Sequence, residues 1–192
     1  MQIHTARMVL RPIEEADCAA FVSYYAGREE HWRPWMPRMV AESYEAWFAS
    51  SLERSRVSWR DGGAYRFVGV LPDGTIATMI NLSNVVRSAF QNADAGWGVR
   101  GDLQGRGFAR EGLIAVLNAA FRTESAGGLG LHRVQAAIIP RNERSLALAG
   151  RVGFRREGLA LRMIELNGVW EDHLIFAKLA DEQSGEGERR EP

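Results

Sequence analysis

The spacing of hydrophobic residues along the chain predicts alternating strands and helices. Short runs rich in β-branched and aromatic residues predict strands, and apolar residues three or four positions apart predict helices. The predicted strands are residues 7–12, 65–71, 75–82, a segment ending at Val99, 132–139, a segment beginning at Phe154, 161–166 and 169–179. The predicted helices are residues 14–26, 43–60, 107–124 and 143–152.

A glycine-rich segment separates the strand that ends at Val99 from the next helix. It reads GWGVRGDLQGRGFAREG over residues 96–112. Gly105 and Gly107 permit positive φ and a close approach of another molecule, and the free N–H groups at a helix start attract anions. The segment lacks the Lys-Ser or Lys-Thr of a P-loop and the dinucleotide glycine spacing. We predict an anion-binding turn, with a plain helix-start turn as the alternative.

The segment HWRPWMPR, residues 31–38, contains two prolines, which disfavour regular helix and favour extended backbone. It displays Trp32, Trp35 and Met36. These side chains either cap the core or form an apolar wall for a bound substrate. Residues 81–91 mix polar residues with strand formers, and they line a polar cleft or form a surface turn.

Two motifs together resemble those of the GNAT N-acetyltransferases. The first is Q-x-x-G-x-A, from Gln104 to Ala109, and the second is N-x-x-S followed by G-F, from Asn142 to Phe154. The segments WRPWMP, NVVRSAF, QGRGFARE, NERS and LNGVWEDH are similar to the RimJ/RimL-type ribosomal-protein alanine N-acetyltransferases, over residues 7–179. The resemblance implies an α+β fold with a mixed, V-shaped sheet of about six to seven strands, splayed beside a bulge in the strand ending near Val99, and helices on both faces.

The resemblance also implies a site for acetyl-CoA in the splay of the sheet. The N–H near Val99 would stabilise the thioester oxygen as negative charge develops on it. The implied acyl-CoA contacts are Trp97, Val99, Gln104, Gly105, Arg106, Gly107, Phe108, Ala109, Asn142 and Ser145. The implied substrate contacts are Trp32, Trp35, Met36, Asn81, Ser83 and Asn84.

The chain departs from the family pattern at the position of the catalytic acid. Many GNAT enzymes have a tyrosine where this sequence has Ala149. Ser145 is the available substitute, although a serine in the first turn of a helix equally serves as a local capping partner. Glu165 is a candidate base, but Ile164 is equally placed to face the cleft, and a water relay is an equal alternative.

Composition narrows the classes of partner and cofactor. The chain has 192 residues with 24 basic and 24 acidic side chains, which disfavours a strongly basic nucleic-acid binder. Cys18 is the single cysteine, so no internal disulfide forms. The four histidines are isolated in sequence, so we expect no metal site. A signal segment and a membrane-length apolar run of about 20 residues are both missing, so we expect a cytoplasmic protein without a membrane partner.

We expect a single domain over residues 1–180, followed by a disordered tail over residues 181–192, and a monomer or homodimer. The favoured function is transfer of the acetyl group from acetyl-CoA to a protein N-terminus, possible acceptors including a ribosomal protein. One alternative is acetylation of a small amine such as an aminoglycoside or polyamine. The other is a non-catalytic CoA-binding or ribosome-associated protein, motivated by the missing tyrosine and the unassigned base.

Overall fold

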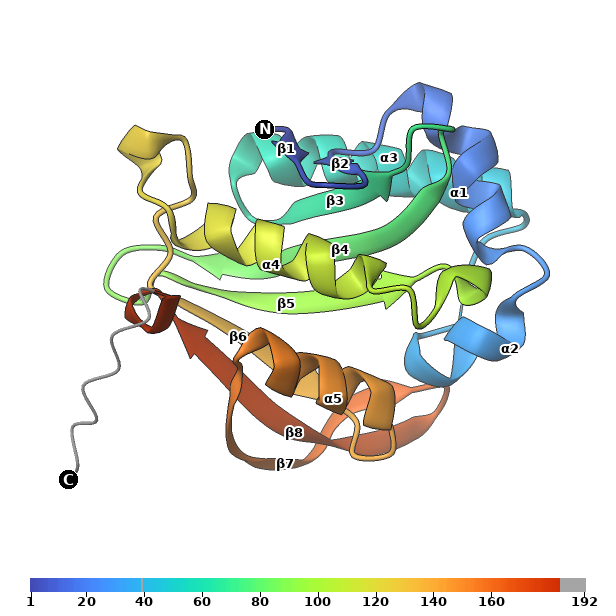
Figure 1. Ribbon diagram of the computed structural model, residues 1–192. Helices are drawn as coiled ribbons and strands as arrows, with labels where there is room; N and C mark the ends of the chain where they lie inside the picture. The colour runs from blue at the N-terminus through green and yellow to red at the C-terminus, as the bar shows by residue number, and fades with distance from the viewer. Residues whose placement is uncertain (39, 184–192) are drawn as a thin grey trace.

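The computed structural model describes residues 1–38 and 40–183. It contains one open 8-stranded sheet with the strand order β1-β2-β3-β4-β5-β6-β8-β7 (Figure 1). The strands are β1 (Ile3–His4), β2 (Val9–Arg11), β3 (Tyr65–Val70), β4 (Ile76–Val86), β5 (Asn92–Val99), β6 (Arg133–Ile138), β7 (Arg155–Leu166) and β8 (Val169–Leu179). The mixed α+β class is confirmed, and the predicted strand number was slightly low. The strand missed is β1, which is too short to show a periodic pattern, and the two strands predicted from Phe154 and over residues 161–166 are one strand, β7.

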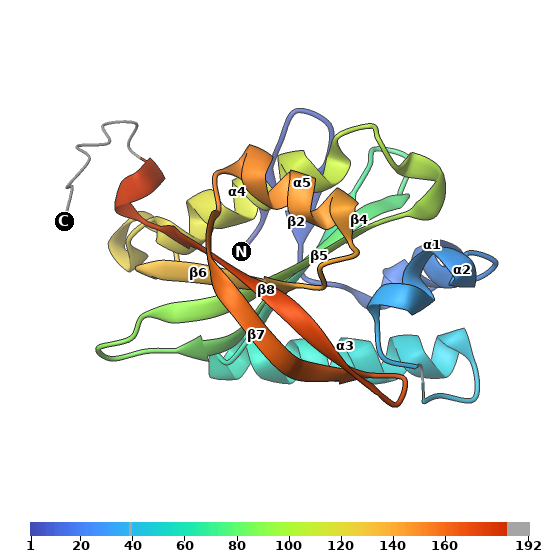
Figure 2. The same ribbon diagram turned by 90° about the horizontal axis from the view of Figure 1, so that it is seen from below.

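Helices cover both faces of the sheet. The α-helices are α1 (Cys18–Tyr25), α2 (Glu29–Trp32), α3 (Tyr44–Asp61), α4 (Phe108–Phe121) and α5 (Glu143–Val152). Figure 2 shows α4 and α5 on one face and α3 on the other, with α1 and α2 beside the open end of the sheet. The predicted start of α3 is confirmed, because Ser43 accepts a hydrogen bond from the Ala46 N–H at 3.1 Å.

The sheet opens between its only parallel neighbours, β5 and β6, within the described residues. These strands pair at their beginnings, from Asn92↔Arg133 to Asp94↔Gln135, and the rest of β5 has no partner on that side. The V shape is therefore confirmed. The expected bulge in β5 was wrong: the extra residue next to the splay is in β4, between Ser83 and Val86. Asn84 adopts a φ of 50° there, a conformation that asparagine tolerates better than most residues.

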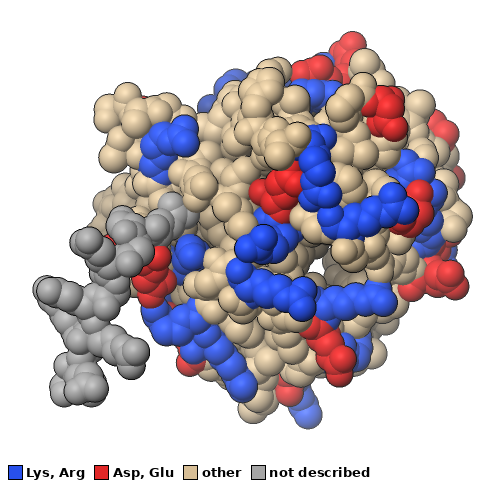
Figure 3. All heavy atoms as spheres, in the orientation of Figure 1, with Lys and Arg blue, Asp and Glu red and all other residues tan. Residues whose placement is uncertain are grey.

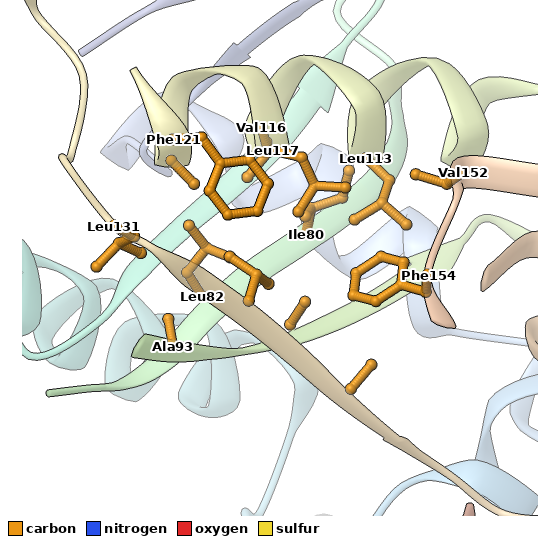
Figure 4. Packing of buried hydrophobic residues seen from close by; sticks show 14 of the residues in the cluster. Ile80, Leu82, Ala93, Leu113, Val116, Leu117, Phe121, Leu131, Val152 and Phe154 are labelled. Atoms are coloured by element: carbon orange, nitrogen blue, oxygen red, sulfur yellow. The ribbon is translucent and has the colours of Figure 1, made fainter. Parts of the chain in front are cut away.

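The main hydrophobic core fixes α4 against the sheet. Leu113, Val116, Leu117 and Phe121 of α4 pack over Ile80, Leu82 and Ala93, and Phe154 closes the cluster (Figure 4). Gly112 permits this close approach, because a Cβ there would lie 2.7 Å from Ile80 Cδ1. The position of the helix start, and of the glycine-rich turn before it, is thus set by tightly packed side chains.

The predicted extended backbone over residues 31–38 was wrong for most of that segment. Trp32 ends α2, and Arg33–Trp35 form a 3-10 turn before Met36 becomes extended. Pro34 occupies an early position in this turn, where a missing N–H leaves no hydrogen bond unmade. Asp181–Gln183, the first residues of the expected tail, form a 3-10 turn. Residues 184–192 of that prediction lie outside the described residues.

Candidate active site

The glycine-rich turn presents backbone N–H groups at the open end of the splay. Gly105 and Gly107 have φ values of 73° and 81°, which confirms their predicted left-handed conformation. Gly107 is the N-cap of α4, and no side chain caps this helix start. The first N–H groups of α4 are therefore free to bind an anion, with the helix dipole adding to the attraction.

Arg7 holds this turn in place from β2's side of the sheet. Its Nη1 donates to the Arg106 carbonyl at 2.8 Å, and its Nε donates to Glu111 Oε2 at 2.6 Å. Burial alone would raise the pKa of Glu111, but hydrogen bonds from Thr5 and Arg7 outweigh it, and the pKa is lowered. The positive charge of Arg7 thereby offsets the negative charge of Glu111, the one carboxylate in the first turn of α4, which would otherwise repel an anion.

Arginine side chains surround the same opening. Figure 3 shows Lys and Arg side chains gathered over the gap between α4 and α5. Exposed arginines on the two helices and their approaches include Arg106, Arg110, Arg144 and Arg151. Arg144 donates a hydrogen bond to Gln104 Oε1, and the Gln104 amide also contacts the ring of His31. This face combines several positive charges with the free helix N-terminus, and it suits a phosphate-bearing ligand.

The outer half of β5 offers a row of backbone groups to the splay. The Arg100 N–H donates to the Ala77 carbonyl of the β4 side at 3.0 Å. Because strand residues alternate in the edge they address, the N–H groups of Trp97 and Val99 face away from β4, into the splay. The Val99 carbonyl lies 3.3 Å from His31 Nε2. An extended amide chain can therefore bond to this edge as an added strand does.

The opposite wall of the splay contains the two candidate polar residues of α5. Asn142 caps the helix, accepting the Ser145 N–H on its Oδ1 at 3.2 Å. The Ser145 hydroxyl forms no hydrogen bond with any residue in the described ranges, and its side chain is half-buried. The helix cap is therefore supplied by Asn142, and the hydroxyl of Ser145 is free for another partner.

A polar patch lies on the α1–α3 face of the sheet at the narrow end of the splay. The Asp94 carboxylate accepts hydrogen bonds from Asn84 Nδ2 at 2.7 Å and Gln135 Nε2 at 2.6 Å. Asn81 lies beside Gly96, where an added Cβ would be 2.8 Å from its amide nitrogen. Ser83 is paired with Asp94 across the strands. A carboxylate with lone pairs to spare is a natural partner for an ammonium group.

Comparison with known proteins agrees with this geometry. The profile of the acetyltransferase (GNAT) domain matches residues 7–155. The chain belongs to the GNAT acetyltransferase family. It is therefore an acetyl-CoA-dependent N-acetyltransferase, as the two motifs predicted.

Several relatives resemble this acetyltransferase over nearly its whole length. The [ribosomal protein uS5]-alanine N-acetyltransferase of Escherichia coli K12 is 31% identical over 179 residues, covering 92% of this chain and 90% of that protein. The structure of Mycobacterium smegmatis RimJ in complex with CoA-disulfide has a TM-score of 0.86 and 29% identity, covering 96% of this chain and 90% of its own. The ribosomal-protein-S5-alanine acetyltransferase of Vibrio fischeri has a TM-score of 0.82 and 27% identity, covering 94% and 97%.

In this acetyltransferase, the loop after α2 and the β7–β8 hairpin meet beside the wide end of the splay, where His31 of α2 lies 3.3 Å from the Val99 carbonyl (Figure 1). Arg141 lies over the Trp35 ring at 5.5 Å. Asn167 Nδ2, at the hairpin turn, lies 3.5 Å from the carbonyl oxygens of Arg33 and Met36. Trp32 is buried against Tyr25 and donates its indole N–H to the Tyr25 carbonyl at 3.1 Å.

The predicted site residues are thus divided between several roles. Trp35 and Met36 are partly exposed at the loop, whereas Trp32 is buried in the second hydrophobic cluster, against which Met36 also packs. Phe108 is buried, so only its backbone faces the turn. Glu165 is exposed near the hairpin, and no ion pair involving it occurs in the described part of the chain.

Sequence reasoning missed His31, Asp94, Gln135 and Arg144 as site residues. His31 and Arg144 lie far from Gln104 in sequence, and only the fold brings them to it. Asp94 looked like an ordinary polar residue of a strand, and its position at the start of the splay depends on the β5–β6 register. Among the described residues, no three His, Cys, Asp or Glu side chains cluster as metal ligands, and no helix is long and apolar enough to cross a membrane.

Proposed function

We propose that this acetyltransferase modifies the α-amine of a protein whose first residue is small, such as Ala or Ser, with a ribosomal protein as the candidate acceptor in the cytoplasm. The observation that carries this proposal is the near full-length similarity to enzymes named for the N-terminal alanine of ribosomal proteins uS5 and S5. The acceptor side of the site, described above, is consistent with such a substrate.

The acceptor amine must be neutral to attack the thioester, and the two kinds of protein amine differ greatly in this respect. An α-amine has an ordinary pKa of about 7.8 and a lysine amine about 10.4, so the α-amine is easier to deprotonate at neutral pH by roughly 3.5 kcal/mol. Glu165 is exposed rather than buried, and Asp94 is already hydrogen-bonded twice. A site with these carboxylates serves an α-amine more readily than a lysine.

We place the acyl donor along the open half of β5. Its pyrophosphate would bind the N–H groups from Gly105 to Ala109, near Gln104 and Arg106, and its amide arm would bond to the edge of β5 that includes Trp97 and Val99. The thioester oxygen would then accept an N–H bond from this same edge, which stabilises the charge formed during attack. Asn142 and Ser145 would lie beside the arm, on the α5 wall.

The acceptor would enter from the α1–α3 face. Asp94 would hold the α-ammonium of the peptide, with Asn81, Ser83 and Asn84 around it. Trp35 and Met36, toward the wide end, would contact side chains that follow. At the narrow end the half-buried carboxylate is Asp94, and Glu171 near the loop is already paired with Arg141 at 2.7 Å, whereas a polycation requires several free carboxylates. Arg33, Arg38 and Arg141 on the neighbouring loop and turn are all exposed, and they further disfavour a polyamine.

The proposal is tested by comparing acceptors at saturating acetyl-CoA. A peptide beginning with Ala or Ser should be acetylated at least about 100-fold faster than the same peptide with a blocked N-terminus and one free lysine. A doubly blocked peptide gives the background rate of thioester hydrolysis. Equal rates for the two peptides, or turnover with spermidine and aminoglycosides alone, would overturn the proposal in favour of a small-amine acceptor.

A further inference from the structure

The side chain of Tyr24, on α1, is almost wholly buried but its hydroxyl lies against the catalytic strand. The residue is 5% exposed, and a Cβ added at Gly98 would lie 2.9 Å from Tyr24 Oη. Within the described residues, this hydroxyl has no hydrogen-bond partner. Its neighbour Tyr25 differs, because Tyr25 Oη lies 3.3 Å from the Met79 sulfur. The hydroxyl is not one of the fully buried polar atoms of the described residues that lack a partner, which are Ser55 Oγ and Asn92 Oδ1, so it retains some access and can meet a ligand.

The position of Gly98 indicates what the Tyr24 hydroxyl can contact. Gly98 stands between Trp97 and Val99, whose N–H groups face the splay. Gly98 has no side chain on the face of β5 that meets α1. No side chain of this strand therefore stands between the Tyr24 hydroxyl and the acyl-donor channel. The backbone N–H groups are suited to the thioester oxygen, but they do not serve the sulfur. On α5, the position at which many family members have a tyrosine is occupied by Ala149, which is fully buried.

We propose that Tyr24 is a catalytic residue that donates a hydrogen bond to the sulfur of the acyl donor as it leaves. The amine nitrogen forms its bond to the carbonyl carbon, the carbon–sulfur bond breaks, and the sulfur departs with the electron pair as a thiolate. The proton released by the nitrogen then neutralises the thiolate through solvent. Tyr24 keeps its own proton throughout. This inference rests on the family activity and is independent of which amine is the acceptor.

The environment of Tyr24 favours a hydrogen-bond donor over a proton donor. Burial is the main cause that raises the pKa of Tyr24 well above 10, and the neighbouring Tyr25 adds to it. A thiol has a pKa of about 8.5, so full transfer of the phenolic proton to a thiolate is unfavourable. A neutral phenol in an apolar site instead stabilises a nearby anion by a charge-assisted hydrogen bond.

The substitution Tyr24→Phe tests the role, because it removes the hydroxyl and keeps the ring. We expect kcat to fall about 100-fold, with the KM for acetyl-CoA changed less than about threefold and the melting temperature preserved. Tyr25→Phe is the matched control, since it removes the adjacent buried hydroxyl, and it should keep the wild-type kcat. An unchanged kcat in Tyr24→Phe, or equal losses in both variants, would overturn the inference.

A binding measurement tests the sulfur contact without relying on turnover. At about pH 9, where a CoA thiol is largely ionised, the wild-type enzyme should bind CoA roughly 10-fold more tightly than desulfo-CoA. In Tyr24→Phe this preference should disappear, while desulfo-CoA binds both proteins equally. The same preference in both proteins would show that the hydroxyl does not contact the sulfur, whatever the acceptor proves to be.

Discussion

The two ends of the splay between β5 and β6 present different kinds of atoms. The wide end consists of consecutive backbone N–H groups from Gly105 into α4, with arginines around them. The narrow end consists of side chains from separate elements: Asn84 from β4, Asp94 from β5 and Gln135 from β6. An anion is bound by one short stretch of chain, whereas a specific amine requires groups assembled by the whole fold.

This difference explains why a single fold can retain one acyl donor and accept different amines. Changing a side chain at the wide end leaves the N–H groups and the helix dipole in place. A change at the narrow end alters the shape and charge that face the acceptor, and it leaves the donor site untouched. The two ends should therefore respond separately to substitution, and three variants test this in order of expected effect.

The largest effect should come from Gly107→Glu at the wide end. A carboxylate would stand where the pyrophosphate is expected, and the φ of 81° is unfavourable for any side chain. We expect the affinity for acetyl-CoA to fall at least about 100-fold in calorimetry. Gly127→Glu is the control for backbone strain, because Gly127 has a φ of 77° and lies in open space. Unchanged CoA affinity in a folded Gly107→Glu protein would remove this turn from the site.

A smaller and more selective effect is expected from Asp94→Asn at the narrow end. The loss of the negative charge should raise the KM for an Ala-initiated peptide about 10-fold and leave the dissociation constant of acetyl-CoA unchanged. Asp73→Asn, in the β3–β4 turn, is the matched control. If Asp94→Asn weakened acetyl-CoA binding as much as peptide use, the two ends would not be independent.

The smallest effect concerns the Arg7–Glu111 clamp below the glycine-rich turn. Its carboxylate has a lowered pKa in the folded protein, so its stabilisation is complete above about pH 5 and is lost as the pH falls through that lowered pKa. Glu111→Gln should reduce the free energy of unfolding by about 1 kcal/mol at pH 7, because Arg7 is partly exposed and the pair is screened. Denaturant titrations should show this difference shrinking as the pH falls below the ordinary glutamate pKa of about 4.3; a constant difference would exclude an ionic origin.

The sequence allowed the wide end to be predicted well, because its properties are local. The left-handed glycines, the start of α4 and the Asn142 cap of α5 each depend on a few neighbouring residues, and all are confirmed. The order of strands and helices was also mostly readable from hydrophobic spacing; β1 and α2 were missed, and β7 was predicted as two strands. The two GNAT motifs, residues 104–109 and 142–154, lie in this same region, so the family resemblance assigns these residues to acyl-CoA binding.

The narrow end was less predictable because it depends on register and packing. Asn84 was among the implied substrate contacts, but the bulge that brings its amide to Asp94 lies in β4, whereas a bulge was expected in β5. Trp32 was indistinguishable in sequence from Trp35, yet it is buried against Tyr25 while Trp35 remains partly exposed. Tyr24 had the spacing of a core residue, and its free hydroxyl beside Gly98 follows only from the packing of α1 on β5.

The most direct test of the two-ended site is a crystal structure with a bisubstrate analogue in which CoA is joined through its sulfur to the α-amine of an Ala-initiated peptide. We predict the pyrophosphate on the N–H groups of Gly105 to Ala109, the sulfur within hydrogen-bond distance of Tyr24 Oη, and the peptide on the α1–α3 face near Asp94. A peptide lying on the α4–α5 face, or a pyrophosphate away from the glycine-rich turn, would contradict the account.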